Sequence, residues 1–125
     1  MSTTEQAPAA NLTIVVGTLS RAPERRTLPS GETVLALEVS IRSDQGAAES
    51  VPVAWYDAPV AAERWAPGDQ VLVSGRTRRR FFRVQGVTQS RTEVVATVVL
   101  PTRRAAAARS ALEAAAGQVL SALDP

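Results

Sequence analysis

The sequence predicts one all-β domain followed by a C-terminal α-helix. Three observations support this fold class. The length of 125 residues suits a single domain with its own core. Several runs alternate apolar and polar residues with the period of two that a half-buried strand requires. The last twenty or so residues are rich in alanine and carry apolar residues at helical spacing.

The first three strands follow from the pattern of apolar residues. Apolar side chains recur at every second position over residues 12–16, and again over residues 35–41. A Pro-Ser-Gly turn at residues 29–31 lies between these two runs. A third run, over residues 51–56, is β-branched and aromatic, although Pro52 requires a sheet edge or a bulge there.

A short helix is predicted between the third and fourth strands. Asp57 can act as its N-cap, Pro59 is tolerated in a first turn, and Trp65 shares a face with Val60. The Pro-Gly pair at residues 67–68 ends the helix.

The last two strands lie on either side of a break at Gln85-Gly86-Val87. The fourth begins at Gln70 and runs into an arginine-rich segment, while the fifth covers residues 91–100 and is closed by Pro101. Three strands, a helix and two strands is the order of the five-stranded OB barrel. Other small α+β domains share that order, so order alone does not establish the fold.

The composition argues against an enzyme. The chain has no histidine and no cysteine, which excludes imidazole and thiolate zinc sites and the usual nucleophile-histidine systems. The remaining candidates are carboxylates such as Asp57, Glu63 and Asp69, which are better explained as cap and loop residues. We therefore expect a non-catalytic protein without metal or cofactor.

The N-terminal segment carries no targeting signal. Residues 1–10 lack a basic region followed by an apolar one, and no stretch approaches the length of a membrane span. The sequence thus predicts a cytoplasmic protein, associated with the nucleoid if it binds DNA. Residues 1–10 are expected to form a disordered tail, residues 11–102 the domain, and residues 103–125 a helical tail.

The main functional clue is residues 75–83, which read GRTRRRFFR. A water-facing strand has no folding reason to place two phenylalanines among five arginines, whereas single-stranded nucleic acid offers phosphates to arginine and base faces to aromatic rings. Strand alternation puts a ring beside arginines on each side, although one ring could instead cap the core. A solvated arginine-rich hairpin is the simpler alternative. The candidate binding residues are Arg76, Arg78, Arg79, Arg80, Phe81, Phe82 and Arg83.

Four stretches of the sequence together resemble bacterial single-stranded-DNA-binding proteins. They are NLTIVVGTLSRAPERR, PSGETVLALEVS, AWYDAPVAAERWAPGDQVLVSGRTRRR and RTEVVATVV. The resemblance covers residues 11–100, and its most specific parts are Gly17 with Pro23-Glu24 and Arg26, the Pro67-Gly68-Asp69 turn with Gly75, and Thr92-Glu93-Val94-Val95. It implies an OB-fold protein that binds and protects single-stranded DNA without sequence preference in replication, recombination or repair, and a homo-oligomer, tetramer or dimer.

The resemblance also implies roles for individual residues. Phe82 matches the family's stacking aromatic on the hairpin between strands four and five, and Phe81 has no such counterpart. Trp55 lies where the family has a base-contacting aromatic, but Val51 and Val53 on the same face equally favour a core position. Trp65 is expected to be structural. Three more arginines, Arg25, Arg26 and Arg42, flank loops that edge the groove of an OB barrel and are secondary candidates.

The chain departs from the family in two places. The loop at residues 43–49 has no ring, which predicts weaker binding or a shorter site. The tail lacks the family's acidic tip, so docking of partners through such a tip is not expected. We expect instead a helix with a capping box at Ser110 and a docked stripe at Leu112, Ala116, Val119, Leu120 and Leu123. These departures leave open the alternative of a paralogue that mainly binds another protein. Separately, the sequence leaves open whether the ligand is DNA or RNA.

Overall fold

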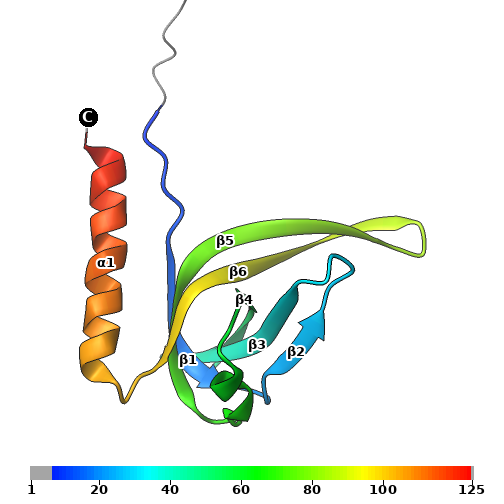
Figure 1. Cartoon of the computed structure of the whole chain (residues 1–125), viewed down its shortest axis with the longest axis horizontal. Coiled ribbons are helices and arrows are strands. Elements are labelled where there is room, and N and C mark those ends of the chain that lie inside the picture. The colour runs from blue at the N-terminus through cyan, green and yellow to red at the C-terminus, as the bar shows by residue number, and fades with distance from the viewer. Residues whose placement is uncertain (1–6, 125) are drawn as a thin grey trace, which may run out of the picture.

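The computed structural model describes residues 7–124 and contains a strongly curved sheet, one short helical turn and one long helix (Figure 1). The prediction for residues 1–6 of the tail lies outside the described residues, and residues 7–10 have no regular structure. The elements in chain order are β1 (Thr13–Leu19), β2 (Glu24–Thr27), β3 (Thr33–Arg42), β4 (Ala48–Tyr56), η1 (Val60–Arg64), β5 (Gln70–Val84), β6 (Val87–Pro101) and α1 (Ala105–Leu123).

The sheet closes on itself, which confirms the OB barrel. Its strand order is β1-β5-β6-β4-β3-β2, and β1 also pairs with β3 at Thr18 and Leu19. At Gly17, β1 turns from β5 toward β3, and an added Cβ would lie 2.4 Å from the Ser40 carbonyl oxygen. Glycine is therefore required for closure. The first predicted strand corresponds to β1, whereas β2, which pairs with β3, was not predicted.

Strand alternation builds the core as the sequence predicts. Alternate residues of β3 and β4 point inward, among them Leu35, Val39 and Val53, and they meet Val71 and Val73 of β5. Burying side chains of this kind contributes roughly 1.5–3 kcal/mol each.

The helix predicted between the third and fourth strands is only a 3₁₀ turn, η1. Its N-cap position is Pro59, so the predicted Asp57 cap is wrong. Asp57 instead adopts a left-handed conformation, with φ of 57°, in the turn that leaves β4. Trp65 closes η1, and its ring stacks on Trp55 with 5.8 Å between ring centroids. The expected structural role of Trp65 agrees with this contact.

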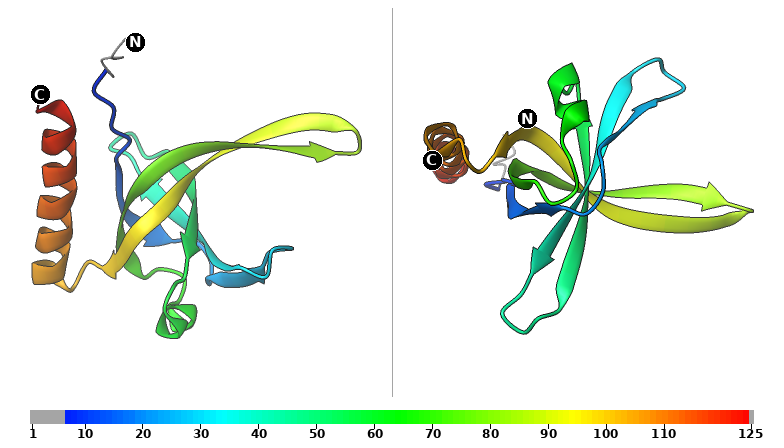
Figure 2. Two further views of the ribbon diagram at one scale, coloured as in Figure 1. Left: turned by 45° about the horizontal axis from the view of Figure 1, so that its top comes forward. Right: turned by 90° about the horizontal axis from the view of Figure 1, so that it is seen from below.

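The two longest strands extend beyond the barrel as a ribbon, which we call the arm (residues 78–93) (Figures 1 and 2). Pairing of β6 with β4 stops at Val94, so that farther out β6 pairs only with β5. The arm ends in a two-residue turn, Gln85-Gly86, in which both residues have positive φ, as a type I′ hairpin requires. Because this turn pairs Val84 with Val87, β6 begins at Val87 rather than at the predicted Arg91.

The C-terminal helix is confirmed, but its predicted contact face is not. α1 lies on the side of the barrel opposite the arm, and it packs against β5 and β6 (Figures 1 and 2). Its buried residue is Ala115, which is 5% exposed, whereas Leu112 and Leu120 of the predicted stripe are exposed. Alanine allows the helix to approach the strands closely, which a leucine face would not. The helix begins after Arg104 without a side-chain cap, so the capping box expected at Ser110 is wrong.

Within residues 7–124, no helix is long and apolar enough to cross a bilayer.

Candidate nucleic-acid interface

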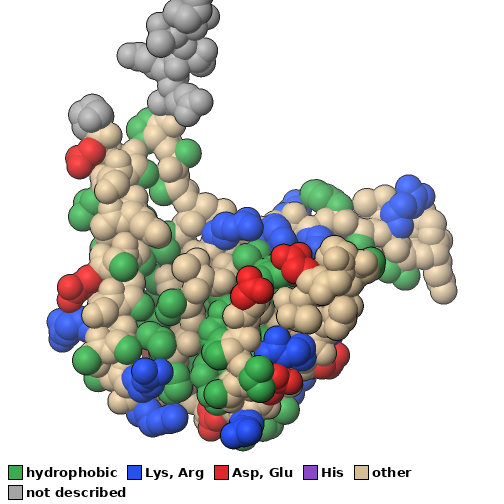
Figure 3. Space-filling model, viewed as in Figure 1, with side chains coloured by type: hydrophobic (Ala, Val, Ile, Leu, Met, Phe, Trp, Pro, Cys, Tyr) green, Lys and Arg blue, Asp and Glu red, His purple; other side chains and the backbone are tan. Residues whose placement is uncertain are grey.

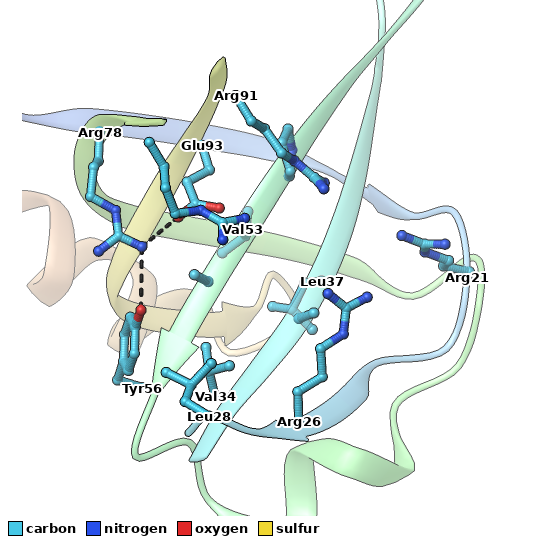
Figure 4. A pocket seen from close by; sticks show the side chains of 14 residues that line it. Arg21, Arg26, Leu28, Val34, Leu37, Val53, Tyr56, Arg78, Arg91 and Glu93 are labelled. Carbon is cyan, nitrogen blue, oxygen red and sulfur yellow. Dashed lines mark hydrogen bonds and ion pairs between the residues drawn. The ribbon is translucent and has the colours of Figure 1, made fainter. Parts of the chain in front are cut away.

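A basic groove lies between the arm and the outer face of β2, β3 and β4 (Figure 4). Its floor is apolar and includes Val34 and Ala54, and its walls carry five arginines and one carboxylate. Figure 3 shows basic side chains at the base of the arm and near its tip. The charged residues that line the groove are Arg21, Arg26, Arg78, Arg80, Arg91 and Glu93.

Strand register determines which arm residues face the groove. Partners that lie directly opposite each other in an antiparallel ladder share a face. The pairs Arg78 with Glu93, Arg80 with Arg91, and Phe82 with Gln89 lie on the groove face. The intervening pairs lie on the other face of the ribbon: Arg79 with Thr92, Phe81 with Ser90, and Arg83 with Thr88.

Arg78 is held at the centre of the groove by two partners. Its Nη2 donates hydrogen bonds to Glu93 Oε2 and, over 3.2 Å, to the Tyr56 hydroxyl (Figure 4). The guanidinium carbon also lies 5.9 Å from the centroid of the Tyr56 ring. The hydrogen bond to Glu93, and then that to Tyr56, raises the pKa of Arg78 above its ordinary value. Arg78 therefore remains charged at every accessible pH, in a fixed orientation.

Glu93 is the buried carboxylate of this cluster, with only 7% of its surface exposed. It lies 3.7 Å from Arg80 Nε and is also paired with Arg78. A buried charge needs such partners because an unpaired one would be costly. The same charge reduces the attraction of the groove for phosphate.

Phe82 lies on the groove face as expected, beside Arg80. The Arg80 guanidinium lies 5.6 Å from the centroid of the Phe82 ring, and the ring is only partly buried. A ring that is partly exposed beside a cation can stack a base while the cation contacts a phosphate. Arg76, by contrast, lines a hollow between the barrel and α1 and is not brought into the groove.

Trp55 is placed in the core. It is 8% exposed and packs with Trp65, so the structure favours the core interpretation over base contact. The next residue, Tyr56, lies in the groove, and the sequence analysis missed it. The signal was present, because inward-facing Val51, Val53 and Trp55 require that Tyr56 face outward.

The three secondary arginines have different surroundings in the structure. Arg25 Nε lies 3.0 Å from Glu63 Oε2, and Arg25 Nη2 donates to the Ala58 carbonyl, so this side chain ties β2 to η1. Arg26 lines the groove. Arg42, at the end of β3, is exposed and is not among the groove residues.

Two groove arginines, Arg21 and Arg91, were not foreseen. Arg21 pairs with Glu38 at 3.3 Å, on the exposed surface. Arg91 forms no ion pair within the described residues, and it faces Arg80 across the arm. Their positions follow from the β1–β2 connection and from the arm register, which the sequence pattern did not supply. No group of three or more potential metal ligands occurs in the part of the chain that the structure describes.

A closed OB barrel with a basic groove and aromatic rings at its walls defines a binding module for single-stranded nucleic acid. The model of the Single-strand binding protein family matches residues 10–101, and the chain belongs to this family. Its general function is therefore single-stranded DNA binding, and the family is non-catalytic. A comparison with curated proteins gives no match. Helix α1 lies outside the matched residues.

Proposed function

We propose that this protein coats and protects single-stranded DNA during replication, recombination or repair, and that the strand lies in the groove between the arm and β2–β4. The observation that carries the proposal is the convergence of five arginines with Tyr56 on one concave surface, with Phe82 next to Arg80 on the same face of the arm. Phosphates attract the arginines through a term that does not depend on sequence, and ring stacking is equally tolerant of sequence.

The residues divide between the two kinds of contact. Arg91 has no competing carboxylate within the described residues, so it is the strongest candidate for a phosphate contact. Tyr56 and the Arg78 guanidinium above it offer one platform for a base, and Phe82 offers another. The Glu93 carboxylate is paired with Arg78 and Arg80, so it has little capacity left to accept hydrogen bonds from base edges. This arrangement supports binding without sequence preference.

The test is a pair of alanine variants titrated with oligo-dT, oligo-rU and a duplex. Phe82→Ala should weaken binding of oligo-dT by roughly 1–3 kcal/mol, the value of one stacked base. Arg42→Ala is the matched control, because Arg42 is exposed and lies outside the groove. Equal losses for the two variants, or equal affinity for duplex and oligo-dT, would contradict a groove that binds single strands. Preference for oligo-rU would favour an RNA ligand.

We also propose that the protein self-associates through β1. Over residues 13–17 this strand pairs with β5 alone, so its other edge is free to accept a strand. Ile14 and Val16, on the outer face of the same strand, are exposed apolar residues. Replacing Val16 with Arg should lower the oligomer mass measured by light scattering, and an unchanged mass would place the contact elsewhere.

A further inference from the structure

The face of the arm that points away from the groove has its own basic and aromatic surface. We call it the far face: Arg79, Phe81, Arg83, Thr88, Ser90 and Thr92. All six residues are exposed, and Phe81 is 64% exposed.

Folding does not account for this surface. The arm is a two-stranded ribbon beyond Val94, so no other strand of the sheet pairs with it there. Phe81 is not part of the core cluster, and the side chains across the ladder from it and its neighbours are small hydroxyl residues. The exposed ring between two arginines therefore has an unfavourable free energy of hydration and contributes nothing to packing.

The charge of the far face differs from that of the groove face. The groove face carries Glu93 as a counter-charge, but the far face contains no carboxylate. Arg79 and Arg83 form no ion pair within residues 7–124. Arg83 donates one hydrogen bond to the Gly86 carbonyl, at 2.7 Å, and its guanidinium has further N–H groups free to donate. The surface thus complements a polyanion.

We propose that the far face binds a second stretch of the same single-stranded DNA, so that a long strand passes from the groove across the arm. Arg79 and Arg83 lie four residues apart along β5, about 13 Å in an extended strand, with Phe81 midway between them. That places a stacking ring between two phosphate contacts. This inference rests on the proposed function, and it adds to it that the length of DNA bound by each chain depends on both faces of the arm.

The experiment compares Phe81→Ala with Phe82→Ala on two lengths of oligo-dT, about 6 and about 16 nucleotides, within the range that one OB fold can bind. Phe81→Ala should weaken binding of the longer oligonucleotide by about tenfold and leave the shorter one unchanged. Phe82→Ala should weaken both. Because Phe81 is exposed, its loss should leave the melting temperature unchanged, which a thermal melt checks.

The salt dependence provides a second measurement. Replacing both Arg79 and Arg83 with Gln should reduce the salt slope for the longer oligonucleotide by about 1.4, with no change for the shorter one. If the Phe81 and arginine variants behave like wild type on both lengths while Phe82→Ala weakens both, the far face does not bind DNA although the groove does. If Phe81→Ala lowers the affinity for both lengths equally, the far face is not a binding surface separate from the groove, and the proposal is overturned. If Phe82→Ala has no effect either, it is the proposed function that fails.

Discussion

Replacing Glu93 with Gln should tighten binding of single-stranded DNA. Among residues 7–124, Glu93 is the one carboxylate that lines the groove, and it lies against Arg78 and Arg80. A phosphate about 6 Å from this carboxylate, in water, is repelled by about 0.7 kcal/mol. Removing the charge should therefore increase affinity about threefold. If one arginine is released to contact a phosphate, the slope of log K against log[salt] should also steepen by about 0.7.

The same substitution should cost stability. Glutamine keeps the shape of Glu93 and can still accept a hydrogen bond from Arg78, so only the charge is lost. Arg78 is partly exposed, which places the cost between that of a surface pair and that of a buried pair, at about 1–2 kcal/mol. Binding is measured by fluorescence anisotropy with labelled oligo-dT at several salt concentrations, and stability by urea unfolding. Glu63→Gln is the control, since Glu63 pairs with Arg25 away from the groove. Weaker binding by Glu93→Gln at unchanged stability would refute the reasoning, because Glu93 would then serve the DNA contact rather than oppose it.

Further substitutions separate the groove from the core and from the helix. Tyr56→Phe should keep the ring but lose the hydrogen bond to Arg78, so we expect only a small loss of oligo-dT affinity. Tyr56→Ala should lose roughly 1–3 kcal/mol of binding free energy. Equal losses for the two variants would mean that the hydroxyl, rather than the ring, contacts DNA. Trp55→Ala should destabilise folding by about 3–5 kcal/mol in urea unfolding. Intrinsic tryptophan fluorescence should change little when oligo-dT binds. Strong quenching would indicate that Trp55 contacts the DNA. Removal of residues 103–125 should change the mass found by light scattering more than the affinity for short oligo-dT, whereas unchanged mass with lost binding would assign DNA contact to the tail.

The fold could be predicted from the sequence because its signals are local. Period-two alternation defines the inward faces of β3 and β4, and Gln85-Gly86 marks the break between β5 and β6, although the arm register was not predicted from it. The helix between β4 and β5 was overestimated, since the backbone is extended at Pro59 and again at Trp65 and only Val60–Arg64 form a 3₁₀ turn.

The site was predicted less completely because it depends on pairing across the sheet. Phe82, Arg78 and Arg80 come from one segment, and alternation alone gave them a common face. The pairing of Arg78 with Glu93 needs the β5–β6 register, and the place of Tyr56 needs β4 beside β6. On α1, helical spacing identified the stripe of Leu112, Val119, Leu120 and Leu123, whereas the side of the helix that carries the buried Ala115 lies against β5 and β6.

The measurement that tests the central claim most directly is ultraviolet crosslinking of the full chain to oligo-dT, with the crosslinked peptides identified by mass spectrometry. If single-stranded DNA lies in the groove, the crosslinks should fall on the peptides that carry Tyr56 and Phe82, and unlabelled oligo-dT should compete them away where duplex does not. Crosslinks confined to α1 or to the η1 peptide of Trp65, with none on β4 or the arm, would contradict the assignment of the groove.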